Sequence, residues 1–247
     1  MVHKDKAEIW WMEVAAITDD QWQRMETWLD LAERDRAGRF KFAADRHTYV
    51  AAHVLGRFLL SSWQSQVPPT EWRFSLGDHG KPEVVVAEAM PRYRLNLSHT
   101  GGLAAAALTI DHPIGIDVEW LDRRPPDCLA LAERFFAASE CDLVRQTAPD
   151  QRMLTFLGLW TLKEAYVKAI GKGLAQPLDA FAFTLDPVAI RFDGDDDPGC
   201  WLFRRFSPTP RHLMALALGH DQPAQVDITA RPVTFAQLAG GGAIRSP

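Results

Sequence analysis

The sequence runs twice from a helical region into a set of short strand-like segments. The first helical region covers residues 43–63, where apolar residues recur every four positions. The second covers residues 150–170 and ends at the glycine-containing segment GKGL. Strand-like runs follow each region, at residues 72–76, 93–100, 103–110 and 113–120, and then at 180–185, 189–193, 200–206 and 212–218. This repeated order predicts an α+β protein built from two similar halves.

The boundary between the halves is expected near residue 112. We assign residues 1–112 to an N-terminal half, residues 113–230 to a C-terminal half, and residues 231–247 to a flexible tail that ends in GGGAIRSP. Further helix starts are predicted at Thr18, where a glutamine three residues on completes a capping box, and at Ser139.

Composition narrows the class of protein. The chain has 247 residues, of which 47% are hydrophobic and 24% charged, as expected for a globular protein. A net charge of −5 gives no reason to expect nucleic acid as a partner. No apolar run approaches the roughly 20 residues needed to span a bilayer, and the N-terminus lacks a signal-peptide pattern. Three widely spaced cysteines form neither a zinc nor a disulfide pattern. We therefore expect a cytoplasmic protein without a membrane partner.

Two carboxylates occupy one face of a predicted strand. In the segment IGIDVEW, Asp117 and Glu119 alternate with apolar residues, so both side chains point to the same side. Neighbouring carboxylates repel each other unless they face water or share a cation. An exposed strand face and a cation site explain this segment equally well.

A second group of polar residues lies on the second long helix. Trp160, Glu164 and Lys168 recur every four residues and form one row along the helix. An ordinary surface ion pair between Glu164 and Lys168 is one interpretation, but the indole on the same row argues against full exposure. The segment GKGL then offers free backbone amides just beyond the helix.

Phosphate-binding chemistry is suggested in the N-terminal half. Ser98 and His99 end a predicted strand just before a glycine pair, and Lys81 and Pro82 lie in a turn. Hydroxyl, imidazole and backbone amide groups at such a place suit phosphate oxygens, although each residue alone also fits a structural role. A local basic cluster in an otherwise acidic chain adds Arg36, Arg39, Lys41 and Arg46. The chain has no nucleophile elbow, P-loop or dinucleotide fingerprint, which leaves a metal-plus-phosphate site.

These segments together resemble one family. In order, GKP, NLSHT, IGIDVE and WTLKEAYVKAIGKGL resemble the 4′-phosphopantetheinyl transferases of the larger, Sfp-type class, from about Arg36 to about Leu218. The resemblance implies two similar α+β halves that form a pseudo-dimer, with the active site in the cleft between them. It also implies transfer of the phosphopantetheine arm of coenzyme A to a serine of an apo carrier protein, with release of 3′,5′-ADP. A monomer is expected, because the two halves replace a subunit interface.

The resemblance also implies roles for individual residues. Asp117, Glu119 and Glu164 correspond to Mg²⁺ ligands, and Glu164 is also the implied base for the serine hydroxyl. Lys168 corresponds to the lysine that neutralises the leaving phosphate. The residues implied in coenzyme A binding are Lys81, Pro82, Ser98 and His99, together with Lys168 and with Arg36 and Arg46 as candidates for the 3′-phosphate. The family usually has a basic residue at the position held here by Glu33.

Three functions fit these motifs. The leading hypothesis is the transferase, which requires Mg²⁺, coenzyme A and an apo acyl, peptidyl or polyketide carrier domain. A degenerate relative would bind coenzyme A or a carrier without transfer. A metal-dependent nucleotide pyrophosphohydrolase would use the same carboxylates and need no carrier, but GKP and NLSHT fit it less well. The sequence does not identify the carrier or the pathway.

Overall fold

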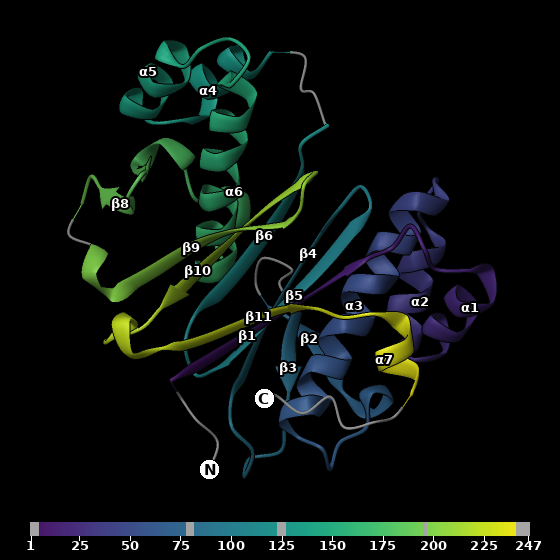
Figure 1. Ribbon diagram of the computed structural model, residues 1–247. Helices are drawn as coiled ribbons and strands as arrows, with labels where there is room; N and C mark the ends of the chain where they lie inside the picture. The colour runs from purple at the N-terminus through teal and green to yellow at the C-terminus, as the bar shows by residue number, and fades with distance from the viewer. Residues whose placement is uncertain (1–4, 78–81, 123–126, 195–196, 241–247) are drawn as a thin grey trace. The chain divides into compact units, whose positions relative to one another are not determined.

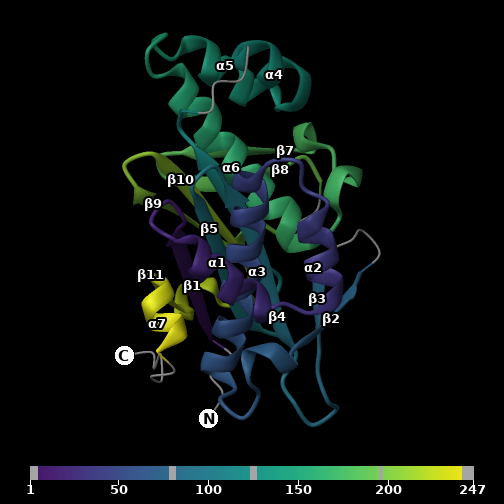
Figure 2. The ribbon, with the colours of Figure 1, turned by 90° about the vertical axis from the view of Figure 1, so that its right-hand side faces the viewer.

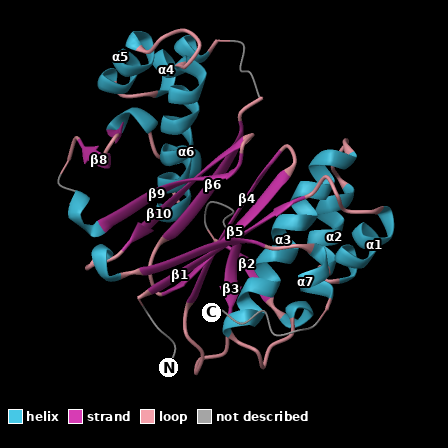
Figure 3. Ribbon diagram, in the orientation of Figure 1, coloured by secondary structure: helices cyan, strands magenta, loops and turns pink. Residues whose placement is uncertain are grey.

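Two compact units make up the computed structural model (Figure 1), namely Met1–His112 with Val226–Pro247, and Pro113–Gln225. The structure describes residues 5–77, 82–122, 127–194 and 197–240. Each unit combines one main sheet with helices (Figure 3), which confirms the predicted α+β class. Within the described ranges, no helix is long and apolar enough to cross a bilayer.

The first unit contains a four-stranded sheet in the order β11-β1-β5-β4. Its strands are β1 (Lys6–Glu13), β4 (Tyr93–Thr100), β5 (Leu103–Ile110) and β11 (Asp227–Pro232). Neighbours are antiparallel except for β1 and β11, which are parallel. Every residue of β5, an inner strand of this sheet, is buried.

Helix α3 (Ala43–Trp63) lies against β5 and β4 (Figure 2). The approach is close, because a Cβ atom built on Gly56 of α3 would lie 2.9 Å from the Leu97 side chain on β4. Helices α1 (Asp19–Thr27) and α2 (Leu31–Gly38) pack against α3. A capping box starts each of them, at Thr18 as predicted and at Asp30, and each box satisfies free backbone N–H groups of the first turn. A separate hairpin pairs β2 (Arg73–Leu76) with β3 (Pro82–Val85).

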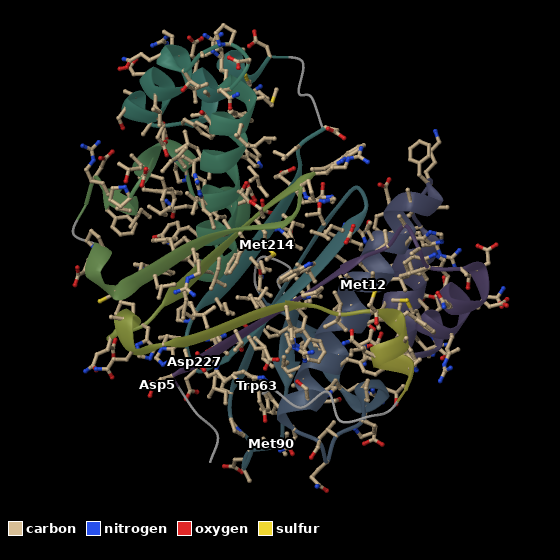
Figure 4. All side chains as sticks on the ribbon, viewed as in Figure 1. Asp5, Met12, Trp63, Met90, Met214 and Asp227 are labelled. Carbon is tan, nitrogen blue, oxygen red and sulfur yellow. The ribbon has the colours of Figure 1, made fainter. Side chains whose placement is uncertain are left out.

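The end of the chain differs from the sequence prediction. Residues 226–230 were assigned to the C-terminal half, but β11 pairs with β1, so they belong to the first unit. Figure 4 shows Asp5 and Asp227 where this pairing begins, and the Asp227 N–H donates to the Asp5 carbonyl at 2.9 Å. The predicted flexible tail is also wrong for residues 233–239, because Val233 and Leu238, the latter in α7 (Phe235–Ala239), are buried in the core of this unit. Residues 241–247 of that tail lie outside the described residues.

The second unit contains a three-stranded antiparallel sheet in the order β6-β10-β9. Its strands are β6 (Ile114–Trp120), β9 (Trp201–Thr209) and β10 (His212–Gly219). Helix α6 (Arg152–Ile170) lies over β6 and β10, and α4 (Cys128–Phe135) and α5 (Ala138–Gln146) pack against α6. A hairpin of β7 (Phe181–Leu185) and β8 (Val188–Phe192) completes the unit.

The helix ends of this unit follow local rules. Helix α6 ends at Gly171, whose φ of 71° is left-handed, so the predicted stop at GKGL is confirmed. Helix α5 begins at Ala138 and not at Ser139, because the Ala137 N–H donates to the side chain of Glu140, which lies inside the first turn. Short 3-10 helices link the other elements: η1 (Pro69–Glu71), η2 (Gly173–Ala175), η3 (Leu178–Ala180), η4 (Pro198–Cys200) and η5 (Pro223–Gln225).

Candidate active site

Strand β6 has one apolar face and one face that carries acids. Ile114, Ile116 and Val118 are buried and share a face with Met214, the cross-strand partner of Val118 on β10 (labelled in Figure 4). Asp117 and Glu119 point to the other face and are also buried, with 5% and 7% exposure. The acids therefore lie on an interior surface, which excludes the solvated strand face that the sequence left open.

The acidic face of β6 is the face that α6 covers. Gly115 is in phase with Asp117 and Glu119, and a Cβ atom built on it would lie 2.5 Å from the backbone nitrogen of Ala169 in α6. Such a contact leaves no room for a side chain, so the strand and the helix meet backbone to backbone. The polar row of α6 is thereby brought next to the acids of β6.

Glu164 and Lys168, called the α6 row below, meet Asp117 at this contact. The ammonium group of Lys168 donates to Asp117 Oδ1 at 2.6 Å. Burial raises the pKa of Glu164, the negative charge of Asp117 raises it further, and the charge of Lys168 lowers it in part. Two carboxylates and one ammonium group thus form a single electrostatic cluster, in which Lys168 pairs with Asp117 of the neighbouring strand and its charge also acts on Glu164.

The cluster has the donor chemistry of a magnesium site. Carboxylate oxygens are the ligands that Mg²⁺ prefers, and Asp117, Glu119 and Glu164 supply them from adjacent elements. The ammonium group of Lys168 already pairs with Asp117, which shows that the acidic face of β6 stabilises a positive charge. The donors fit a hard cation by their chemistry. Across the described part of the chain, however, no group of three or more His, Cys, Asp or Glu side chains is arranged to hold a metal ion.

In the first unit, Ser98 and His99 lie near the end of β4, as predicted. The His99 side chain reaches α3, where its Nδ1 lies 3.3 Å from Thr48 Oγ1 and its ring meets Tyr49 edge to face, with 6.3 Å between ring centroids. Ser98 is buried, whereas His99 is exposed. The end of β4 and the first half of α3 are therefore joined by polar and aromatic contacts.

The two predicted 3′-phosphate residues have separate surroundings. Arg36 on α2 lies over the ring of Phe40, 6.0 Å from its centroid. Arg46 on α3 forms an ion pair with Glu26 of α1 at 2.6 Å. Lys81 lies outside the described residues, and Pro82 is the first residue of β3.

Glu33, which replaces the basic residue usual in the resembled family, is a buried structural acid. Its Oε2 accepts a hydrogen bond from Arg57 Nε at 2.9 Å, and its Oε1 lies 2.8 Å from His53 Nδ1. The fully buried Arg57 also donates to Asp30 at 2.9 Å. This cluster ties the start of α2 to the middle of α3, so position 33 of this chain holds a structural carboxylate.

Sequence reasoning missed two residues of the second unit. The contact of Gly115 with α6 was not predicted, although a glycine in phase with two acids on one strand was the available signal. Lys163 was given no role from the sequence. In the structure it is fully buried and its Nζ lies 2.7 Å from Glu140. A lysine within an otherwise apolar helical face was the signal there.

Two protein-family models match this chain, and both describe 4′-phosphopantetheinyl transferases. Residues 113–217 match the model described as 4′-phosphopantetheinyl transferase superfamily, and residues 16–110 match the model described as 4′-phosphopantetheinyl transferase, N-terminal.

Curated relatives match most of the chain. The chain is 29% identical to 4′-phosphopantetheinyl transferase Sfp of Bacillus subtilis, over 87% of this chain and 93% of that protein. It is 35% identical to 4′-phosphopantetheinyl transferase HetI of Nostoc sp., over 69% and 70%. It is 33% identical to a 4′-phosphopantetheinyl transferase of Bacillus pumilus, over 79% and 81%.

Proposed function

The chain belongs to the 4′-phosphopantetheinyl transferase superfamily, and we propose that it moves the phosphopantetheine arm of coenzyme A onto a serine of an apo carrier protein, with release of 3′,5′-ADP. The observation that carries this proposal is the cluster of Asp117, Glu164 and Lys168 at the contact of β6 with α6. It places acids and a cation together in a chain whose relatives are named for this reaction.

We assign Asp117, Glu119 and Glu164 as the residues that would hold Mg²⁺. When bound, the ion would neutralise charge on the pyrophosphate and help to orient it. In the structure Lys168 forms an ion pair with Asp117. For transfer, its side chain has to leave Asp117 and turn to the phosphate of the departing 3′,5′-ADP, where its charge compensates the negative charge that develops.

Glu164 is the residue proposed to take the proton of the serine hydroxyl. Its carboxylate lies at the contact of β6 with α6, beside Asp117 and Lys168, and a carboxylate there can take the proton directly or through a water molecule. In the transfer, the serine oxygen forms a bond to the phosphorus that carries the pantetheine arm, and the bond from that phosphorus to the bridging oxygen breaks. The proton passes to a Glu164 carboxylate oxygen, and 3′,5′-ADP leaves with the bridging oxygen.

Residues of the first unit are proposed to bind coenzyme A. Ser98 and His99 suit its phosphates, and Lys81, Pro82, Arg36 and Arg46 are proposed for the remaining phosphate and adenosine contacts. We also propose that the two units form a pseudo-dimer with coenzyme A in the cleft between them, and that the protein acts as a cytoplasmic monomer. The support for the two-half arrangement is the order of the motifs and the match of two family models to consecutive halves of the chain.

The test is incubation with coenzyme A, Mg²⁺ and a panel of apo carriers from acyl, polyketide and non-ribosomal peptide pathways. One carrier is expected to gain the mass of the phosphopantetheine arm, and 3′,5′-ADP is expected to appear in equal amount. Asp117→Ala and Glu164→Ala should abolish transfer, and Lys168→Ala should lower kcat more than it weakens coenzyme A binding. Asp142→Ala, which changes an exposed carboxylate of the same unit, serves as the matched control.

Other outcomes separate the alternative functions. Release of 3′,5′-ADP from coenzyme A without any carrier would indicate a pyrophosphohydrolase. Tight binding of coenzyme A with no transfer to any carrier of the panel would indicate a binding module. Full activity after chelation of divalent metals would refute the metal assignment, because transfer would then not depend on a bound ion.

A further inference from the structure

We propose that the buried ion pair of Lys163 with Glu140 is a positioning device that fixes the rotation of α6 and so aims the α6 row at Asp117. The inference deepens the proposed function and rests on it for its catalytic consequence. Lys163 directly precedes Glu164 in the chain, and Glu140 lies in the first turn of α5.

The pair is completely enclosed. Both side chains have no solvent exposure, and Lys163 Nζ lies 2.7 Å from Glu140 Oε2. The same ammonium group donates to the carbonyl oxygens of Leu178 at 2.6 Å and Phe181 at 2.7 Å. Its Nζ also lies over the ring of Phe181, 4.3 Å from the centroid. Lys163 is therefore held in one position from several directions.

The hydrogen bonds around the pair hold both side chains in place. Lys163 Nζ has three oxygen partners, and an ammonium group can donate to all three. Glu140 accepts from the Phe183 N–H at 2.8 Å and from the Ala137 N–H at 3.1 Å, and its Oε2 lies 2.7 Å from Lys163 Nζ. Burial lowers the pKa of Lys163 and raises the pKa of Glu140, and their mutual attraction opposes both shifts in part. Each polar atom of the pair therefore has a partner.

Lys163 is thereby excluded from direct contact with a substrate. Its three N–H bonds are used, and its side chain is fully buried. Lys168, by contrast, is 28% exposed and touches Asp117. Of the two lysines, Lys168 is the one placed to reach a phosphate, and the role left for Lys163 is structural or positional.

The positional role follows from helix geometry. Successive residues of a helix are separated by about 100° around its axis, so fixing the direction of Lys163 fixes that of Glu164 and of Lys168 one turn later. The pair joins α6 to the start of α5 and to residues 178–183, on a side of the helix other than the one that meets Gly115. Two contacts on different sides of α6 prevent it from turning about its axis.

Stability alone does not account for such a pair. Replacing a buried ion pair by apolar side chains of similar volume often leaves stability unchanged or increases it, whereas removing one partner is strongly destabilising. If the pair serves to orient α6, a double apolar variant should lose kcat even while it remains folded. If the pair serves only stability, the folded double variant should keep the wild-type kcat. This difference provides the test.

The experiment compares wild type with Lys163→Met/Glu140→Met. We expect the double variant to fold but to unfold at a lower urea concentration than wild type, because the carbonyls of Leu178 and Phe181 and the Phe183 N–H lose their partners. In the carrier assay its kcat should fall roughly 10- to 100-fold, because small displacements of catalytic groups have effects of this size. The KM for coenzyme A should change little. Arg145→Met/Asp142→Leu, which removes an exposed ion pair of the same helix α5, is the matched control and should keep the wild-type kcat.

A second readout needs neither carrier nor metal. The coupling between Asp117 and Lys168 is measured by a double-mutant cycle of Asp117→Asn and Lys168→Met in urea denaturation. We expect a clear coupling in wild type and its loss in the Lys163→Met/Glu140→Met background. If wild type transfers nothing to any carrier, the proposed function fails, and this cycle still tests the positioning role.

Two results would overturn the inference. One is a folded double variant with wild-type kcat, and the other is an unchanged coupling between Asp117 and Lys168. If the double variant does not fold, Glu140→Gln replaces it, because this change keeps the volume and removes the charge. Loss of the coupling in Glu140→Gln is then the expected result, and its retention refutes the proposal.

Discussion

Gly115 and Ala165 are in direct backbone contact: a Cβ atom built on Gly115 would lie 2.0 Å from the carbonyl oxygen of Ala165. Real Cβ atoms do not approach other atoms so closely, so position 115 tolerates hydrogen and nothing larger. The contact sets the distance between β6 and α6. Because Asp117 follows on the same face of β6, it also sets the distance between Asp117 and the α6 row.

Gly115→Ala should therefore push α6 away from the sheet. We expect a loss of stability of about 1–3 kcal/mol, the usual range for overpacking, and a large loss of transferase activity. Urea denaturation measures the first effect and the carrier assay the second. Gly158→Ala is the control, because a Cβ atom at Gly158 would meet only side-chain atoms at 3.6 Å. Alanine is favoured over glycine inside a helix, so the control should gain about 0.5–1 kcal/mol. Wild-type stability and activity in Gly115→Ala would show that α6 can move without consequence.

The role of Gly115 shows where sequence reasoning stops. Period-two alternation placed Asp117 and Glu119 on one face, and the four-residue spacing of Glu164 and Lys168 placed them on one helix row; the structure has both arrangements. Which helix covers which strand is a tertiary property, and no local pattern encodes it. The contact at Gly115 and the pair of Lys168 with Asp117 both depend on that packing.

The same reason explains the missed strand β11. Its segment DITARP has little apolar alternation, and its partner β1 lies at the other end of the chain. Pairing between segments so far apart in the sequence depends on the assembled sheet. An edge strand with a weak apolar alternation gives no local signal for it. The helices α3 and α6, by contrast, were predicted closely, because they are long and have clear end signals.

Lys168→Met tests the electrostatics of the cluster in the absence of metal. Without the ammonium group, Asp117 and Glu164 repel each other, and Asp117 loses a hydrogen bond at 2.6 Å. We expect metal-free protein to lose roughly 1–3 kcal/mol, the range for hydrogen bonds to charged groups. Added Mg²⁺ should raise the Tm of the variant more than that of wild type, because no ammonium group has to be displaced.

Lys172→Met is the control for this prediction. Lys172 lies just beyond the end of α6 and is exposed, so its removal should change stability by less than about 0.5 kcal/mol. Thermal unfolding with and without Mg²⁺ gives the stability of the metal-free protein and the Mg²⁺-dependent shift of Tm for each variant. An equal Mg²⁺-dependent shift of Tm in wild type and Lys168→Met would contradict competition between Lys168 and the metal.

Glu33 should make the stability of the protein depend on pH. Burial raises the pKa of Glu33, but the hydrogen bond to His53 and the charges of His53 and Arg57 outweigh it and leave the pKa below the ordinary value of 4.5. A carboxyl group with a lowered pKa in the folded state contributes stability above its unfolded pKa. This contribution disappears as the pH falls through the folded value.

The free energy of unfolding of wild type minus that of Glu33→Gln should therefore be largest near neutral pH and should shrink below pH 4.5. Urea denaturation over a pH series measures this difference. The variant should be less stable than wild type at pH 7, because the buried Arg57 loses one of its two carboxylate partners. A difference that stays constant from pH 7 to acid would show that Glu33 acts through shape and not through its charge.

Leu238→Ala tests the finding that the chain end is part of the first unit. Leu238 is 2% exposed and belongs to the core that also contains Trp10 and Met12 of β1. Removing a buried leucine side chain leaves a cavity and typically lowers stability by about 2–5 kcal/mol. The control is Leu31→Ala, since Leu31 is 76% exposed and its truncation creates no cavity. If residues 231–240 were a flexible tail, the two variants would unfold at the same urea concentration. A lower midpoint for Leu238→Ala alone is the expected result.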